Sequence, residues 1–226
     1  MGVAGGSGPR CDCCYDEAFD VRKAEIELKR YRRSGAPDHT RVLAEALAAG
    51  DAGGLTVLDI GAGVGAVHHL LLEAGASSAV DVDASRPYLD AARSEAARRG
   101  FADRVTFEHG DFTQVSADIG PADLVALDRV VCCHPDGIGI VRAAAERTHR
   151  RLGIVMPREI RLVRWGIAAL NVSEWLRRSA YRAYVHPADR VDEAAVDAGL
   201  RPNPRRRLSL FWQLLTYERA DAQAGG

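Results

Sequence analysis

The stretch VLDIGAGVGAVHHLLLEAGASSAVDVD, residues 57–83, decides the fold class of this chain. It begins with an apolar run, passes through Gly61, Gly63 and Gly65 into a helix-length segment, and ends in a second apolar run that closes on Asp83. Glycines directly after a strand adopt backbone conformations that other residues avoid, and they let a ligand approach the start of the next helix closely. The stretch predicts a strand, a ligand-binding turn, a helix and a second strand.

Short apolar runs and helix-length segments continue to alternate on both sides of this stretch. The apolar runs lie at 55–60, 78–83, 104–110, 122–128 and 152–157, and the helix-length segments at 66–74, 86–99 and 138–151. Repeated strand–helix–strand units give right-handed parallel crossovers and a sheet covered on both faces. We therefore expect an α/β fold.

The two ends of the chain differ from this central pattern. Residues 1–14 are rich in glycine and are expected to form a flexible tail, followed by a single domain over 15–226 that opens with a helical cap over 15–52. In this cap we expect one helix from the N-cap Asp16 to Arg33 and a second helix over 40–49.

Further along the chain, helices over 159–178 and 187–198 are expected to lead into LSLFWQLLTYE, residues 208–218. Both faces of this last run are largely apolar, which is typical of a strand inserted within a sheet rather than one at its edge.

Composition limits the partners of the chain. Its 226 residues carry 30 basic and 31 acidic side chains, so there is no overall positive field to attract nucleic acid. No uncharged apolar stretch reaches the roughly eighteen residues of a membrane span. We therefore expect neither nucleic acid nor membrane as a partner.

The five cysteines fall in two tight clusters, CDCC at 11–14 and CC at 132–133. An odd number in this arrangement does not resemble a secreted disulfide framework, and it favours a reducing, cytoplasmic compartment. Taken together, the two clusters are poorly spaced for a shared metal ion, so no metal site is expected.

Two classes of ligand compete for the glycine turn. GAGVGA followed by Asp83 satisfies the fingerprint of a dinucleotide site, so an NAD(P)-dependent oxidoreductase is one interpretation. Asp59, at the tip of the first strand, favours the other, because its negative charge disfavours a pyrophosphate and suits the cationic methionine end of S-adenosylmethionine. HGDF, residues 109–112, adds an acid and a ring for an adenine.

With LDIGAGVG (58–65), HGDF and LVALDRV (124–130) in this order, the chain resembles the class I S-adenosylmethionine-dependent methyltransferases over roughly residues 40 to 160. The resemblance implies a Rossmann-like, mostly parallel, seven-stranded sheet with helices on both faces, whose last strand is antiparallel and lies beside the fifth. It also implies a reaction, the transfer of a methyl group from S-adenosylmethionine to an acceptor. A S-adenosylmethionine-binding regulator without turnover stays a second alternative.

The resemblance and the chemistry of the residues together give a set of candidate cofactor-binding positions. Asp59 is expected to face the methionine ammonium, the glycines its backbone, Asp83 the ribose, and Asp111 with Phe112 the adenine, while Tyr31 or Arg32 reaches the carboxylate. The full set is Tyr31, Arg32, Asp59, Gly61, Ala62, Gly63, Gly65, Asp83, Ala84, Asp111, Phe112 and Asp128.

The acceptor is expected to be a small molecule. DRVVCCHPD, residues 128–136, supplies His134 as a candidate general base, and its likeness to magnesium-protoporphyrin O-methyltransferase-like sequences suggests oxygen as the receiving atom. The same segment lacks the Asp-Pro-Pro-Tyr type of motif of amino-methylating nucleic-acid enzymes. Residues 159–187 are expected to form the acceptor pocket, and arginines within it such as Arg161 are compatible with an acidic acceptor.

Overall fold

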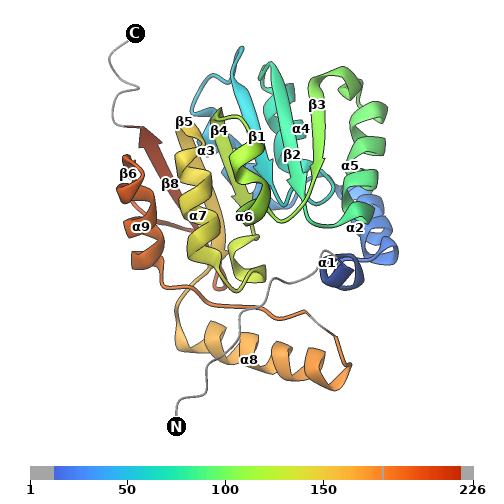
Figure 1. Cartoon of the computed structure of the whole chain (residues 1–226), viewed down its shortest axis with the longest axis vertical. Coiled ribbons are helices and arrows are strands. Elements are labelled where there is room, and N and C mark those ends of the chain that lie inside the picture. The colour runs from blue at the N-terminus through green and yellow to red at the C-terminus, as the bar shows by residue number, and fades with distance from the viewer. Residues whose placement is uncertain (1–12, 180, 220–226) are drawn as a thin grey trace.

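A central sheet with helices on both faces makes up the fold (Figure 1). The computed structural model describes residues 13–179 and 181–219. Along its main path the strands follow the order β3-β2-β1-β4-β5-β8-β6, and the short β7 pairs with β8. The strands are β1 (Thr56–Ile60), β2 (Ser78–Asp83), β3 (Val105–His109), β4 (Ala122–Asp128), β5 (Thr148–Pro157), β6 (Leu200–Pro202), β7 (Arg206–Arg207) and β8 (Trp212–Arg219).

The first five strands are parallel, and β8 is antiparallel to both of its main neighbours, β5 and β6. Leu214, Leu215 and Tyr217 of β8 are almost completely buried, as expected for a strand inside the sheet. The predicted α/β class and the inserted antiparallel strand beside β5 are confirmed. The eighth strand, β7, has only two residues and was not expected.

Nine α-helices are present in the described residues, and six of them cover the two faces of the sheet. They are α1 (Cys13–Ala18), α2 (Val21–Ser34), α3 (Asp38–Ala48), α4 (Ala66–Glu73), α5 (Arg86–Arg98), α6 (Phe112–Val115), α7 (Gly137–Glu146), α8 (Arg161–Leu176) and α9 (Ala188–Asp197). Helices α3, α4 and α5 pack on one face, and α6, α7 and α9 on the other. None of the described helices is long and apolar enough to cross a membrane.

Strand β1 shows how the sequence sorts the two faces. Leu58 and Ile60 join the apolar core on the α7 and α9 side, whereas Val57 joins the core on the α3 and α4 side. Because successive side chains of a strand point to opposite faces, Asp59 also points toward α4. This orientation decides what Asp59 contacts.

The cap differs from the expectation. Asp16 lies inside the short α1, and the N-cap of the following helix is Asp20, whose Oδ1 accepts a hydrogen bond from the backbone N–H of Lys23 at 2.9 Å. The break at Phe19 places that ring edge-on against Tyr88 and Tyr181. Of the expected tail, residues 1–12 lie outside the described residues, and residues 13 and 14 begin α1.

Two other boundaries were wrong. The helix expected over 138–151 ends at Glu146, because residues from Thr148 onward pair with β4 and, from Arg151, also with β8. The last strand begins at Trp212 rather than at 208, since the N–H groups of Phe211 and Trp212 both donate to Ser209 Oγ and form a turn. Leu210 in this turn is exposed.

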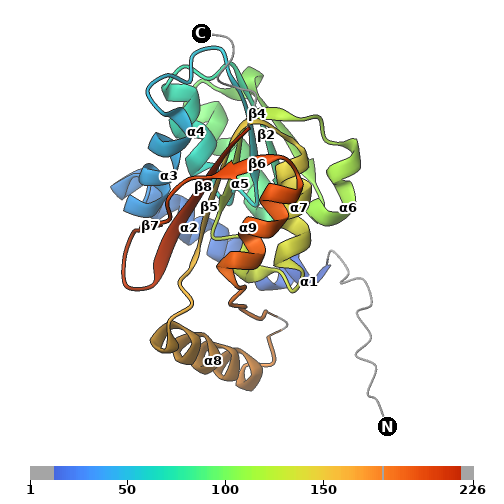
Figure 2. The ribbon, with the colours of Figure 1, turned by 90° about the vertical axis from the view of Figure 1, so that its left-hand side faces the viewer.

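Helix α8 is set apart from the layers. It lies beyond the carboxyl ends of the parallel strands, and it is joined to the sheet by the end of β5 and by the segment that leads to α9 (Figure 2). Only a narrow face of α8 is buried, through Val163 and Ile167, which pack with Ala183.

Candidate cofactor and acceptor site

A cavity of about 690 Å³ opens at the carboxyl ends of β1, β2 and β4. The cap covers it through α2, and the inner face of α8 borders it from below. Most of the residues predicted from the sequence meet here, although they come from distant parts of the chain. Those that line the cavity are Tyr31, Gly61, Ala62, Gly63, Asp83, Ala84, Asp111, Phe112, Asp128 and His134.

The glycine turn presents bare backbone to this cavity. Gly61 and Gly63 have φ values of 63° and 59°, in the left-handed region that glycine adopts without strain. A Cβ added to Gly61 would lie 2.6 Å from a methyl carbon of Val130, so no side chain fits there. The turn is therefore built so that a ligand can approach the main chain closely.

Asp83 is held beside this turn at the end of β2. Its Oδ2 accepts the N–H of Gly63 at 3.1 Å, and its Oδ1 accepts the N–H of Ser85 at 2.8 Å. Burial raises the pKa of Asp83 to about 6, although these two hydrogen bonds oppose the shift, and the negative charges of Asp59 and Glu27 add to it. The carboxyl group is fixed in direction and borders the cavity.

Asp59 and Gly65 are not brought to the cavity. Asp59 is fully buried, and its Oδ2 accepts the backbone N–H of His68 at 3.1 Å and lies 3.0 Å from His68 Nδ1. A Cβ on Gly65 would lie 2.6 Å from the His68 ring. Both residues therefore support the turn from the α4 side, and the structure does not bring the Asp59 carboxyl into contact with the cavity.

Asp111 and His134 form a pair across the cavity wall. Asp111 is the N-cap of α6, with Oδ1 accepting from the N–H and the hydroxyl of Thr113, while Oδ2 lies 3.1 Å from His134 Nε2. The N–H of Asp136 donates to His134 Nδ1 at 3.0 Å, so the proton of the neutral ring lies on Nε2 and is donated to Asp111. Both ring nitrogens of His134 are thus engaged within the protein.

The charges of this pair support each other. Burial is the largest single influence, raising the pKa of Asp111 and lowering that of His134. Their mutual hydrogen bond and attraction, together with the hydrogen bonds from Thr113 to Asp111 and from Asp136 to His134, outweigh it, so the pKa of Asp111 lies below and that of His134 above its ordinary value. The geometry favours a role for His134 in holding Asp111 and does not present a free nitrogen to an acceptor.

The end of β4 contributes contacts to the cap. Asp128 Oδ2 accepts from the Thr40 hydroxyl at 2.6 Å, and Arg129, with φ of 64°, lies against Asp128 and Glu27. Glu27 in turn accepts from the Tyr88 hydroxyl at 2.8 Å. Sequence reasoning missed Glu27, Tyr88 and Arg129, although the position of Arg129 directly after Asp128 was a usable signal.

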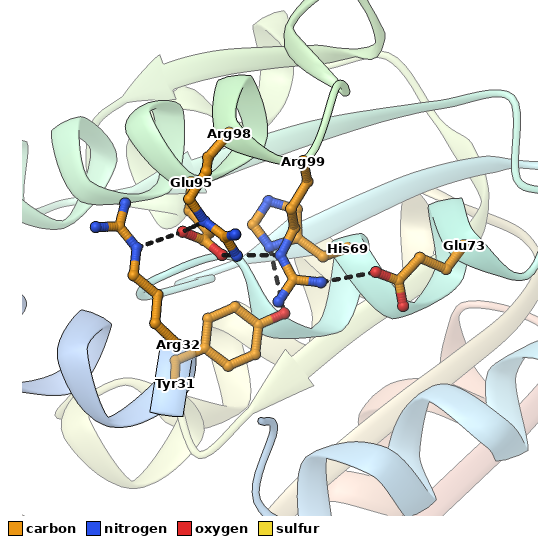
Figure 3. Close-up of polar contacts among 7 residues, drawn as sticks. All are labelled: Tyr31, Arg32, His69, Glu73, Glu95, Arg98 and Arg99. Atoms are coloured by element: carbon orange, nitrogen blue, oxygen red, sulfur yellow. Dashed lines mark hydrogen bonds and ion pairs between the residues drawn. The ribbon is translucent and has the colours of Figure 1, made fainter. Parts of the chain in front are cut away.

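The polar groups of Tyr31 and Arg32 are directed away from the cavity. Figure 3 shows the Tyr31 hydroxyl directed toward His69 and Arg99, and it lies 3.5 Å from His69 Nδ1. Arg32 Nε donates to Glu95 at 2.7 Å. Burial raises the pKa of Tyr31 to about 12 and, with the neighbouring His68, lowers that of His69 to about 2. Tyr31 borders the cavity, but its hydroxyl is directed to His69, and Arg32 does not line the cavity.

The far half of the cavity is apolar. Its walls include Ile167 and Leu170 of α8, together with Ala183, Phe211 and Trp212.

Two free thiols, Cys132 and Cys133, also line the cavity, with their sulfurs 3.9 Å apart and Cys133 Sγ 3.4 Å from the Tyr181 hydroxyl. Within the described parts of the chain, no group of His, Cys, Asp and Glu side chains is arranged to hold a metal ion. Cys11 lies outside the described residues.

Comparison with known proteins agrees with this geometry. Residues 57–152 match a family described as a methyltransferase domain. A curated relative, the ribosomal protein arginine N-methyltransferase rmt3 of Schizosaccharomyces pombe, is 33% identical over 112 residues, which is 49% of this chain. The chain spans only about a fifth of the length of that relative (20%).

Solved structures share the fold. The magnesium protoporphyrin IX methyltransferase of Synechocystis PCC 6803, solved with bound SAH and separately with bound SAM, is 20% identical in its SAH complex, with a TM-score of 0.68 over 93% of this chain and 100% of that one. An O-methyltransferase family protein from Burkholderia thailandensis is also 20% identical, with a TM-score of 0.68 over 91% of this chain and 62% of that one. Residues 57–152 therefore match a methyltransferase domain, and the chain has the fold of these solved methyltransferases.

Proposed function

We propose that this protein transfers the methyl group of S-adenosylmethionine to a small molecule, at an oxygen atom. The single observation that carries the proposal is the 690 Å³ cavity, which joins a bare glycine turn and four acidic side chains at one end to an apolar half at the other. One end has the polar groups that a nucleoside needs, and the other has room for an acceptor.

The residues at the polar end fit the cofactor. Asp83 would accept hydrogen bonds from the ribose hydroxyls, and Asp111 with the ring of Phe112 would hold the adenine. Asp128 and Ala84 border the same end of the cavity. When bound there, S-adenosylmethionine supplies an electrophilic methyl group on a positively charged sulfur.

Glu27 takes over the role that sequence reasoning assigned to Asp59. Its Oε1 would lie 3.9 Å from a Cβ on Gly63, so this carboxylate is next to the turn and lines the cavity, whereas Asp59 does not. We infer that Glu27 faces the methionine ammonium. The cationic side chains that line the cavity in the described residues are Lys23, Arg30 and Arg129, and they would attract the methionine carboxylate.

Positioning accounts for most of the catalysis we infer. Holding two reactants in line supplies roughly 7 to 11 kcal/mol, and a general base adds about 3 to 5 kcal/mol. His134 would act here as a positioning residue, because both of its nitrogens are engaged. The chain thus relies on orientation and on the exclusion of water by the cap.

The apolar half of the cavity is formed by residues 159–187, which include α8, and by the β7–β8 turn. It favours a small, largely apolar acceptor. A protein arginine acceptor, as the name of the curated relative states for that protein, would require carboxylates to pair its guanidinium. Of the residues that line this half in the described chain, namely Pro157, Ile167, Leu170, Tyr181, Ala183, Phe211 and Trp212, none is acidic. The free thiols Cys132 and Cys133 agree with a reducing compartment such as the cytoplasm.

Calorimetric titration tests the cofactor site. We expect Asp83→Asn to weaken the binding of S-adenosylmethionine by at least about 100-fold, because two hydrogen bonds to a charged acceptor contribute roughly 1.5 to 3 kcal/mol each in the wild type. Asp90→Asn, at an exposed acid outside the cavity, is the matched control and should bind normally. Binding of NAD(P)H in place of S-adenosylmethionine would contradict the proposal.

Turnover needs a separate experiment. The purified protein is incubated with methyl-labelled S-adenosylmethionine and a fractionated extract of its source cells, and labelled products are detected by mass. A labelled small molecule, absent with Asp83→Asn, is the expected result. Tight cofactor binding without any labelled product would instead indicate a S-adenosylmethionine-binding regulator.

A further inference from the structure

Helix α8 carries most of the large apolar side chains that the described part of the chain leaves in solvent. Leu162, Trp165, Val172, Trp175 and Leu176 are 62%, 75%, 57%, 65% and 69% exposed. Elsewhere in the described residues, side chains of this kind are scattered over α2, α9 and the β7–β8 turn. Such a concentration on one helix marks a contact surface rather than ordinary exposure.

The exposed side chains form a continuous stripe. Leu162, Trp165, Ala169, Val172 and Leu176 follow one another at alternating steps of three and four residues, which aligns them along one side of a helix. The opposite side carries the buried Val163 and Ile167. Helix α8 therefore has two apolar faces, of which the protein covers one.

The flanks of the stripe are basic. Arg161 and Arg164 are exposed on the helix, and Arg177 and Arg178 follow directly after it. The acid within α8 is Glu174, whose side chain is only 14% exposed and accepts from Arg177 at 3.2 Å. The outer face thus combines leucine, valine and tryptophan with a net positive charge, since Glu174 pairs with one of the four arginines.

We propose that the outer face of α8 binds the surface of an anionic lipid bilayer. An amphipathic helix with basic flanks and an apolar stripe that contains tryptophan lies in the interfacial plane of such a membrane. Two copies of the stripe packed against each other would bring these arginines together without acids to pair them, so charge disfavours a second copy of the chain as the occupant.

The position of α8 gives this surface a use. Its outer face points away from the sheet (Figures 1 and 2), while Ile167 and Leu170 of the same helix line the cavity. A bilayer docked on α8 would therefore lie next to the apolar end of the cavity. The proposal replaces the expectation from composition that no membrane takes part, and it does not depend on the methyl-transfer proposal.

Vesicle flotation with the full chain tests the proposal. We expect the protein to float with vesicles of phosphatidylcholine mixed with phosphatidylglycerol and not with phosphatidylcholine alone, and its binding should fall as salt is added. Replacing Arg161 and Arg164 together by glutamine should weaken binding about 25-fold, at about fivefold for each arginine. The matched charge control is Arg190→Gln, on the exposed side of α9.

The apolar stripe has its own variants. Trp165→Ser with Leu176→Ser should weaken vesicle binding at least about tenfold, because each side chain loses its burial in the interface. Val196→Ser, at a half-exposed apolar position on α9, is the control and should bind as the wild type does. Unchanged affinity of the stripe variant for S-adenosylmethionine and an unchanged circular dichroism spectrum would show that it is folded.

Tryptophan fluorescence gives a direct readout, since the chain has three tryptophans. Brominated phosphatidylcholine mixed with phosphatidylglycerol should quench Trp165 and Trp175, and the quenching should persist in Trp212→Phe and disappear when the other two are replaced.

Vesicle binding that the stripe variant leaves intact would overturn the proposal. The proposal would also be overturned if the wild type did not bind vesicles but formed a dimer in sedimentation equilibrium, and the stripe variant were monomeric. The first result would locate the membrane contact elsewhere, and the second would assign the stripe to a second copy.

Discussion

Two buried carboxyl groups, Glu95 on α5 and Asp81 on β2, lie on the same side of the sheet. They differ in their hydrogen-bond partners and in their charge. Both are 0% exposed. Glu95 accepts hydrogen bonds from Arg32, Arg98 and Arg99, whereas both oxygens of Asp81 have no hydrogen-bond partner in the described structure. Burial alone therefore does not determine the charge of an acid in this protein.

The surroundings set opposite charge states. Burial works to raise the pKa of Glu95, but its three arginines overcome it and hold the pKa at about 2. Burial raises the pKa of Asp81 well above its ordinary value, and the neighbouring carboxyl groups of Asp83 and Asp59 raise it further. Glu95 is an ionised anchor between α2 and α5, while Asp81 is a neutral acid beneath the cofactor turn.

Removing the charge of Glu95 should change the stability of the fold more than any other substitution considered below. Glu95→Gln leaves three arginines facing a neutral amide, and we expect the free energy of unfolding to fall by about 3 kcal/mol, measured by urea denaturation. The wild type should lose this stabilisation as the pH falls from about 4.5 through about 2, because the unfolded chain then takes up the proton first.

The matched control for this anchor is Glu73→Gln. Glu73 pairs with Arg99 at 2.7 Å but is 47% exposed, so the loss should stay below about 1 kcal/mol. Equal losses for the two variants would mean that burial adds nothing to the Glu95 anchor.

Asp81→Asn should have a smaller effect and should stabilise the fold rather than destabilise it. Above pH 3.8 the unfolded wild type releases the proton that folded Asp81 keeps, so wild-type stability falls as the pH rises, by about 1.4 kcal/mol per pH unit. The amide cannot titrate, so the variant should gain that amount over the wild type between about pH 5 and pH 6. Parallel pH profiles of the two proteins would show that Asp81 is ionised in the fold.

Tyr31→Phe should have the smallest effect. The hydroxyl lies 3.5 Å from His69 Nδ1, at the limit of a hydrogen bond, so the expected loss of stability is about 0.5 kcal/mol. Because this hydroxyl points to His69, the affinity for S-adenosylmethionine should not change. A tenfold weaker affinity by calorimetry would restore the cofactor contact that the sequence suggested.

The sequence predicted what local pattern encodes. The strand ends at Asp83 and Asp128 and the turn at Gly61 are set by neighbours in the chain, so apolar runs followed by glycine or acid locate them accurately. The inserted β8 also follows from pattern, because both of its faces must be apolar.

What depends on distant contacts was beyond the sequence. Asp59 lies one residue before the end of β1, whereas Asp83 is the last residue of β2, and nothing near Asp59 in the chain shows that His68 encloses it. The hydroxyl of Tyr31 is likewise directed by α4 and the guanidinium of Arg32 by α5, after the chain has crossed the sheet. The outer face of α8 was missed for another reason, since the amphipathic pattern of a helix does not reveal which of two apolar sides is covered.

The insertion of β8 between β5 and β6 has a consequence for folding during synthesis. Residues 212–219 pair with the edge of β5 that β4 leaves free, so during synthesis this edge stays open until residues 212–219 have left the ribosome. Until then β5 exposes a row of unpaired amide groups to other nascent chains. Closure of this edge therefore waits for the last strand of the described chain.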